Sequence, residues 1–293
     1  MSAIFWQKYL YLFPTHGYNG LRTRLKRRTF IYVRNLIANN LIRKTKRSNA
    51  VSVDLQLYVK LQFLANGGFQ WLIGNTTQIS QASASRIIRV VDSLVEISDQ
   101  FIKFPSVGRF HCGFPNVLGT IDCTHVRLQK PSQNPDQYVD RFFHHSINVQ
   151  LVCGPDLRIL NVLAAYPGGN HDAYIWRNSA LRTAFLDGVF PDGWLIGDSG
   201  YPQENWLMTP VANPRTQAEE LYNAVHIVTR NTIERCNGAL KSRFRCLSMT
   251  GEPMDIDDDV MQLIAENRQQ APYQEDMYDV NARNVLIRDS FTR

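Results

Sequence analysis

The chain has 293 residues, of which 44% are hydrophobic, so it can build a substantial core and wholesale disorder is excluded. Its formal net charge is +6, and no stretch approaches the 18 consecutive apolar residues that indicate a membrane span. The five cysteines are widely spaced and form no Cys-x-x-Cys pair, which argues against a disulfide scaffold or structural zinc site and favours a reducing compartment.

The charge is distributed unevenly along the chain. Residues 1–50 carry eleven Lys or Arg and no Asp or Glu, whereas residues 251–293 carry four basic and ten acidic residues. A long acid-free basic stretch indicates binding to nucleic acid, and a solvated basic face on an ordinary helical domain is the alternative. We expect residues 251–293 to form a flexible acidic tail.

Residues 21–110 are expected to form an all-α region. Residues 21–47 have the composition of basic helical material, and residues 53–65 form an amphipathic helix that ends at Asn66-Gly67-Gly68. A short helix at 69–74, a polar turn at 75–81 and a longer helix from about residue 82 follow. This order is typical of a helix-turn-helix, with a plain helical hairpin as the alternative.

The second helix of this unit carries the residue types that contact DNA. Ser83, Ser85, Arg86 and Arg89 lie near its N-terminal half, where small or cationic side chains can enter a major groove and reach phosphates or guanine edges. We therefore predict these four residues to bind DNA.

Pro and Gly residues between 100 and 116 predict a domain boundary, after which residues 111–250 have the pattern of an α/β domain. An apolar run at 117–121 ends in Asp122, and residues 146–153 and 158–165 form a β-hairpin around Gly154-Pro155-Asp156. A helix at 171–185, a strand at 194–197 ending in Asp198, and a helix at 228–247 complete a central mixed sheet flanked by helices.

Two aspartates and a glutamate in this domain predict a metal centre. Asp122 and Asp198 each follow a buried strand, and Glu234 lies on the last helix in a charged stripe with Arg230 and Lys241. Three carboxylates form an oxygen-rich site for Mg²⁺ or Mn²⁺. Two such ions can activate a water or a DNA 3′-hydroxyl to attack a phosphodiester bond. Any one of the three, taken alone, is more commonly a turn, a cap or a solvated side chain.

The cations of this stripe, Arg230 and Lys241, would hold DNA phosphates beside the metal centre. Asp172 is a candidate auxiliary acid near the centre, although a helix N-cap is the preferred interpretation of this residue.

Other patterns are weaker. Gly197-Asp-Ser-Gly200 matches the nucleophile motif of trypsin-like proteases, but the β-rich context of those enzymes is missing. Trp176 and Trp206 are expected in the core. The histidines show no spacing typical of a transition-metal site: His125, His144, His145 and His171.

Four motifs make the interpretation more specific. With the stretch 205–210 they resemble the Harbinger transposase-derived nucleases of the PIF/Harbinger group, over about residues 50–248. The motifs are Gly119-Thr-Ile-Asp-Cys-Thr-His125, Gly168-Gly-Asn-His-Asp-Ala173, Leu195-Ile-Gly-Asp-Ser-Gly-Tyr201 and the run from Asn231-Thr-Ile-Glu-Arg to Cys246.

The resemblance implies an RNase H-like fold with the metal triad Asp122, Asp198 and Glu234, the last two separated by 35 intervening residues. A related bacterial insertion-sequence signature, Tyr-x₂-Arg-x₃-Glu-x₆-Lys, is kept at Arg230, Glu234 and Lys241 but has Ile227 at the Tyr position. The resemblance also implies a divalent metal, residence in the nucleus and, in many members, a separate Myb/SANT-like DNA-binding partner. We keep the cytoplasm as a second expected location.

The chain departs from the family pattern in two places. Residues 1–20 are an atypical N-terminal segment, and after Leu247 the chain passes to the acidic run where family members continue with an apolar helix.

The three carboxylates and the family resemblance together predict a metal-dependent endonuclease that hydrolyses DNA phosphodiester bonds. A domesticated, catalytically silent DNA-binding or scaffold protein is the alternative.

Overall fold

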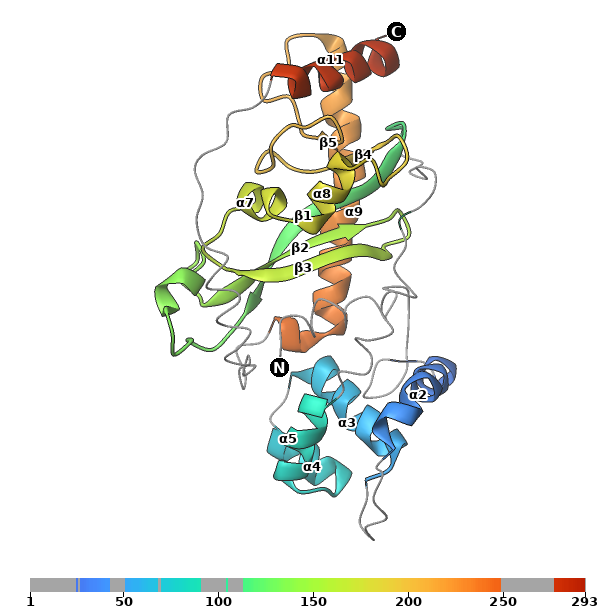
Figure 1. The fold of residues 1–293 in the computed structure, drawn as a ribbon, viewed down its shortest axis with the longest axis vertical. Coiled ribbons are helices and arrows are strands. Elements are labelled where there is room, and N and C mark those ends of the chain that lie inside the picture. Colours follow the sequence, from blue (N-terminus) through green and yellow to red (C-terminus); the bar gives the residue numbers. More distant parts are fainter. Residues whose placement is uncertain are drawn as a thin grey trace.

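The computed structural model describes residues 25, 27–42, 51–67, 70–90, 104, 113–248 and 277–292. The N-terminal segment 1–20 and most of the predicted boundary at 100–116 lie outside these residues. Figure 1 shows a group of helices at one end of the molecule and a twisted sheet crossed by a long helix at the other.

The predicted all-α region contains four described helices: α2 (Arg27–Leu41), α3 (Val53–Asn66), α4 (Gln70–Thr77) and α5 (Gln81–Val90). The Ser52 side chain caps the start of α3, and Gly67 ends it in the left-handed conformation, φ 62°, as the sequence predicts. α4 continues three residues past the predicted end at residue 74. The helix-turn-helix interpretation stays a prediction.

The helical region shares its core with the sheet. Buried Leu57 and Leu61 of α3 belong to the same hydrophobic cluster as Val149 of the sheet and Ile233 of the long C-terminal helix. Lys60 is also fully buried, and its ammonium donates to the carbonyl of Ile88 in α5. The region is therefore packed against the α/β domain through apolar contacts.

The α/β domain is built on one five-stranded mixed sheet, which confirms the predicted fold class at that level. The sheet order is β3-β2-β1-β4-β5, with β1 to β3 antiparallel and β4 and β5 parallel to β1. The predicted hairpin is present as β2 and β3. The strands are β1 (Val117–Arg127), β2 (Ser146–Cys153), β3 (Ile159–Pro167), β4 (Trp194–Ile196) and β5 (Leu207–Met208).

Helices cover both faces of this sheet (Figure 1). The long helix α9 (Gln217–Arg243) packs on one face, where Ile233, Cys236 and Leu240 meet the apolar side chains of β1 and β2. The short helices α7 (Asp172–Arg177) and α8 (Ala180–Leu186) pack on the other face around Trp176, which is fully buried as expected.

The helix boundaries differ from the sequence expectations in two places. The single helix expected at 171–185 is two helices, because the chain breaks at Asn178 and the Ser179 side chain caps a new helix by accepting from Arg182 N. Helix α9 begins eleven residues before the expected residue 228, at a capping box formed by Thr216 and Glu219. It ends at Arg243, before the 3₁₀ turn η4 (Arg245–Leu247).

The C-terminal segment contains a packed helix, α11 (Met277–Phe291). Leu286, Ile287 and Phe291 are buried in one cluster with Phe114 and Tyr222. The expectation of a flexible tail at 251–293 therefore fails for residues 277–291, because apolar residues at helical spacing give this segment a face to bury. Residues 251–276 lie outside the described residues.

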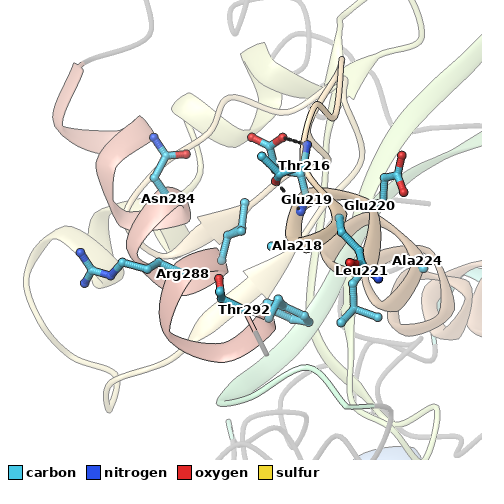
Figure 2. A pocket seen from close by; sticks show the side chains of 12 residues that line it. Thr216, Ala218, Glu219, Glu220, Leu221, Ala224, Asn284, Arg288 and Thr292 are labelled. Atoms are coloured by element: carbon cyan, nitrogen blue, oxygen red, sulfur yellow. Dashed lines mark hydrogen bonds between the residues drawn. The ribbon is translucent and has the colours of Figure 1, made fainter.

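Helix α11 and the first turns of α9 enclose a groove of about 880 Å³, lined by both helices (Figure 2). The groove lies at Thr216 to Ala224, whereas the charged stripe begins at Arg230. It therefore belongs to the packing of α11 on α9 and lies apart from the predicted acidic residues.

The cysteines that the structure describes are free, in agreement with the expectation of no disulfide scaffold: Cys123, Cys153, Cys236 and Cys246. No helix within the described ranges is long and apolar enough to span a membrane.

Candidate metal centre

Three aspartates from different parts of the chain meet at one point. Asp122 of β1, Asp172 of α7 and Asp198 after β4 each place a carboxylate oxygen within 4.8 Å of the others. The sequence predicted the approach of Asp122 and Asp198 and treated Asp172 as an auxiliary residue. The structure places Asp172 fully in the group.

The meeting point follows from the different lengths of β1 and β4. The parallel pairing of these strands ends at Thr120 and Ile196, whereas β1 continues to Arg127 on its other edge through pairing with β2. Asp122 therefore lies inside β1, and the expectation that it ends a strand is wrong. Asp198 begins the turn after β4, next to the part of β1 that β4 no longer pairs.

Asp172 is positioned by the neighbouring strand β2. The Asn148 side-chain amide donates to Asp172 Oδ1 at 3.0 Å and to the Asn170 carbonyl at 3.0 Å. Asp172 is the first residue of α7 and the N-cap position belongs to His171, so the preferred N-cap interpretation of Asp172 is wrong. The amide of Asn148 instead fixes the carboxyl toward the other two aspartates.

Asp198 is fixed by its own turn. Gly200 N donates to Asp198 Oδ1 at 2.8 Å. A Cβ added at Gly200 would lie 3.0 Å from that oxygen, so a side chain here would crowd the cluster. Buried Tyr201 anchors the turn, with its hydroxyl 3.1 Å from Cys123 Sγ on the α7 face of β1.

Helix α9 approaches the cluster with Asn237, which sequence reasoning missed. The Asn237 side-chain amide donates to Asp122 Oδ2 at 3.1 Å. Lys241, one turn further, donates to the His125 carbonyl at 2.9 Å. Asn237 could have been found from spacing, since it follows Arg230 and Glu234 on the same helix stripe at intervals of seven and three residues.

Glu234 lies outside the aspartate cluster. Its side chain is 49% exposed and accepts from Arg230 at 2.5 Å, one helical turn away. The structure thus brings Asp122 and Asp198 together, as predicted, but leaves the third predicted ligand paired with a cation on the outer part of α9. The role of Glu234 as a ligand stays a prediction.

The crowded carboxyls change the acidity of Asp122. Burial raises its pKa to about 7, and repulsion from Asp198 and Asp172 adds to the effect, while a backbone hydrogen bond and Arg230 oppose it. Burial also lowers the pKa of Lys241, against the attraction of Asp122. Near neutral pH, Asp122 therefore holds a proton in part of the molecules, which reduces the repulsion in the cluster.

A divalent cation would relieve the same repulsion. Carboxylate oxygens are the ligands that Mg²⁺ and Mn²⁺ prefer, and three carboxylates this close need only small side-chain shifts to share one ion. The four histidines considered from the sequence join no such group in the part of the chain that the structure describes. The donor set therefore fits an oxygen-liganded metal.

The predicted DNA-contacting residues of α5 are only partly described. Arg86 is exposed and its guanidinium folds back on the Ala82 carbonyl at 3.1 Å. Ser83 and Ser85 are half-buried, and the Arg89 side chain lies outside the described residues. Their role in DNA binding stays a prediction.

The mixed sheet and its acidic cluster are consistent with a metal-dependent nuclease, and the DDE superfamily endonuclease family matches residues 121–265. The chain is 39% identical over 232 residues to the human protein named "Putative nuclease HARBI1". The aligned region covers 75% of this chain and 66% of that protein. The chain therefore belongs to the DDE superfamily endonucleases, and within them to the Harbinger transposase-derived nucleases.

Other relatives agree. The Xenopus laevis protein of the same name is 36% identical over 249 residues, covering 81% of this chain and 70% of that protein. The Arabidopsis thaliana "Protein ALP1-like" is 27% identical over 254 residues, covering 77% of this chain and 63% of that protein. The chain spans about two thirds of the length of these relatives, and no solved structure matches it.

The raised pKa of Asp122 predicts a stability change in Asp122→Asn. In the metal-free folded protein Asp122 titrates near pH 7, against about 4 when unfolded, so the wild-type free energy of unfolding falls as pH rises between these values. Asn cannot ionise and can still accept from Asn237. The variant should be more stable than wild type at pH 8, and its advantage should shrink by about 2 kcal/mol at pH 5.

Urea denaturation in EDTA at both pH values measures this difference. Asp156→Asn, on the exposed β2–β3 turn, is the control and should follow wild type at both. An advantage of Asp122→Asn that does not depend on pH would contradict the electrostatic explanation.

Proposed function

We propose that this chain is a metal-dependent DNA endonuclease of transposase origin, with the metal held by Asp122 and Asp198. The observation that carries the proposal is the convergence of three carboxyl groups within 4.8 Å in a domain of the DDE endonuclease superfamily. We also propose an RNase H-like fold, which the sheet order and the three antiparallel strands followed by two parallel ones support.

The aspartates would serve as oxygen ligands for Mg²⁺ or Mn²⁺. When bound, such an ion supplies a Lewis acid and an activated nucleophile for phosphodiester cleavage. Asp122, with its pKa near 7, would release its proton on binding the metal, and Asn237 would keep its carboxyl oriented by the hydrogen bond to Oδ2. Asp172 would complete the ligand set or position a water beside it.

The charged stripe on α9 gives DNA a route to the cluster. Arg230 is ion-paired with Glu234, and its guanidinium can take a phosphate in place of that carboxylate. Glu234 would then be released to join the two aspartates as the third ligand. In this proposal, DNA binding completes the triad that the family resemblance implies.

Plasmid nicking in Mg²⁺ or Mn²⁺ tests the chemistry. Each of the single changes Asp122→Asn, Asp198→Asn and Glu234→Gln should reduce nicking at least ~100-fold, because the ligands act as one unit and their losses do not add. Asp172→Asn tests whether this carboxyl is a further ligand. Conversion of supercoiled plasmid to the open circle is the measurement.

The control is Asp156→Asn, which should nick like wild type because its carboxylate lies on the exposed β2–β3 turn and pairs with Arg158. Nicking that persists in Asp122→Asn and Asp198→Asn would rule out the cluster as the catalytic centre.

Metal binding itself should stabilise the folded protein. At pH 8, Mg²⁺ or Mn²⁺ at about 100 times its Kd should raise Tm by about 5 °C or more, because the ion neutralises the repelling carboxylates. The rise should be smaller at pH 6, where a proton on Asp122 competes with the ion. Differential scanning fluorimetry measures both, with Asp122→Asn/Asp198→Asn as the variant expected to lose the shift.

DNA binding by the helical region is a separate part of the proposal. The acid-free basic stretch and exposed Arg86 support it. In the full chain, Arg86→Ala/Arg89→Ala should weaken binding to a duplex and reduce the slope of log K against log salt by about two, because each arginine would neutralise one phosphate. Fluorescence anisotropy at several salt concentrations measures the slope, and an unchanged slope would assign DNA binding elsewhere.

The family resemblance further suggests residence in the nucleus and a Myb/SANT-like partner that supplies target recognition. Nuclear fractionation and co-purification of the tagged chain with such a protein would test these two proposals.

A catalytically silent DNA-binding or scaffold protein is the second candidate. Its support is the position of Glu234, half exposed and paired with Arg230 outside the aspartate cluster. A chain that binds DNA but does not nick it in Mg²⁺ or Mn²⁺, with any partner present, would favour this candidate over the nuclease.

A further inference from the structure

The connection between β1 and β2 ends in a turn with two exposed phenylalanines. Phe142 is 60% exposed and Phe143 is 89% exposed, the highest value among the large exposed hydrophobic side chains in the described part of the chain. Phe143 also has φ 62°, a left-handed conformation that is rare for an aromatic residue and costs free energy. Packing in the core explains neither side chain.

The turn is nevertheless rigidly built. The buried carboxylate of Asp140 accepts from Phe142 N at 2.9 Å and from His144 N at 3.0 Å, and Val139 forms an antiparallel bridge with His145. The Ser146 hydroxyl adds a further hydrogen bond to the same carboxylate at 3.2 Å. Asp140 thus holds the two phenyl rings outward on a fixed backbone.

This turn is attached to the loop that carries Asp172. Gly169 N donates to the Gln137 carbonyl at 3.0 Å, and Gly168 N donates to the Ser146 carbonyl at 2.8 Å. A Cβ at Gly168 would lie 2.2 Å from Ser146 Oγ, so only glycine allows the two loops to pack this closely. Figure 1 shows the β1–β2 connection projecting from the end of the sheet near α7.

One cation lies beside the two rings, and a second is exposed on the same connection. Arg141 lies over the Phe142 ring, 5.0 Å from its centroid, and Lys130 is exposed on the same connection. Within residues 128–145, all of which the structure describes, Asp136 is the one exposed acid, since the carboxylate of Asp140 is buried and hydrogen-bonded. Aromatic rings next to cations match the stacked bases and phosphates of a nucleic acid strand.

We propose that Phe142 and Phe143 form a stacking platform for an unpaired or flipped-out base of the DNA substrate. The proposal rests on the proposed function, because DNA at the aspartate cluster is what passes the turn. The Leu128–His145 hydrogen bond at the base of the turn lies six residues along β1 from Asp122, about 20 Å, so one bound DNA reaches both. A base leaving the stack needs a π-face to replace its neighbours, and the two rings offer one.

Paired DNA probes test the platform with the full chain. Fluorescein-labelled duplexes of one sequence, either fully paired or with one unpaired thymine, are titrated in EDTA so that no cleavage occurs. Wild type should bind the unpaired probe about 10-fold more tightly, as expected for stacking of one base on an aromatic side chain. In Phe142→Ala/Phe143→Asn the two probes should bind with affinities that differ by no more than about 2-fold. Asn is chosen at 143 because it suits the left-handed backbone there.

Two matched variants complete the design. Phe142→Tyr/Phe143→Tyr keeps the aromatic rings and should keep the ratio. Leu186→Ala/Val189→Ala removes two exposed apolar side chains at the end of α8 and should also keep it. Circular dichroism should match wild type in all variants and Tm should not fall, since the altered side chains are exposed; Asn at 143 relieves the left-handed strain and should raise Tm slightly.

A wild-type ratio near one, no DNA binding at all, or an unchanged ratio in Phe142→Ala/Phe143→Asn would overturn the proposal. A change of oligomeric state in that variant, seen by sedimentation without a change of ratio, would assign the turn to a protein partner instead. Plasmid nicking by wild type separates the two proposals: a wild-type ratio near one with normal nicking overturns only the platform. A ratio that depends on the rings without any nicking overturns only the nuclease.

Discussion

Three carboxyl groups meet where β4 stops pairing with β1, and they repel one another. The surrounding structure has to offset this repulsion in order to hold them together. Each carboxyl has its own donor: Asn237 on Asp122, Asn148 on Asp172 and Gly200 N on Asp198. These donors come from a helix, a strand and a tight turn, so the oxygens are held by rigid elements. The repulsion that remains raises the pKa of Asp122, already increased by burial, to about 7 and makes the cluster a place where a cation is favoured.

Helix α9 connects this cluster to the rest of the molecule. One side of the helix, with Ile233, Cys236 and Leu240, belongs to the core shared by the sheet and the helical region. The adjoining side places Asn237 on Asp122 and Lys241 on the β1 backbone. Because the same helix is fixed by apolar packing and contacts the acidic residues, the core determines how closely Asn237 and the stripe around Glu234 approach the aspartates.

Binding and chemistry meet at the Arg230–Glu234 pair. Each residue of the pair balances the charge of the other, while Arg230 also attracts the Asp122 carboxylate. If the chain is a nuclease, DNA phosphate is the competitor that separates them. If it is a silent binding protein, the pair is a surface ion pair of small energetic value. The loop that precedes Asp172 is also hydrogen-bonded, through Gly168 and Gly169, to the residues that flank the Phe142–Phe143 turn.

The sequence by itself determined the helices of the basic region, the β2–β3 hairpin, the mixed sheet and the family. Each depends on local signals, such as Gly67 after α3 or the turn at Gly154, and on motifs that lie within a few residues. It also indicated that Asp122 and Asp198 would meet, because strand ends gather at one edge of a sheet. The early start of α9 was missed although its capping box, Thr216 to Glu219, is local.

Only the tertiary structure decided which side chains complete the cluster. Asp172 and Asn237 are 50 and 115 residues from Asp122, and their approach depends on how far β4 extends along β1 and on how α9 is rotated against the sheet. The packing of α11 likewise depends on an apolar surface formed by Phe114 and Tyr222, which do not adjoin it in the chain. Local patterns specify elements, whereas carboxyl groups are brought together by the relative placement of packed elements, which no short segment encodes.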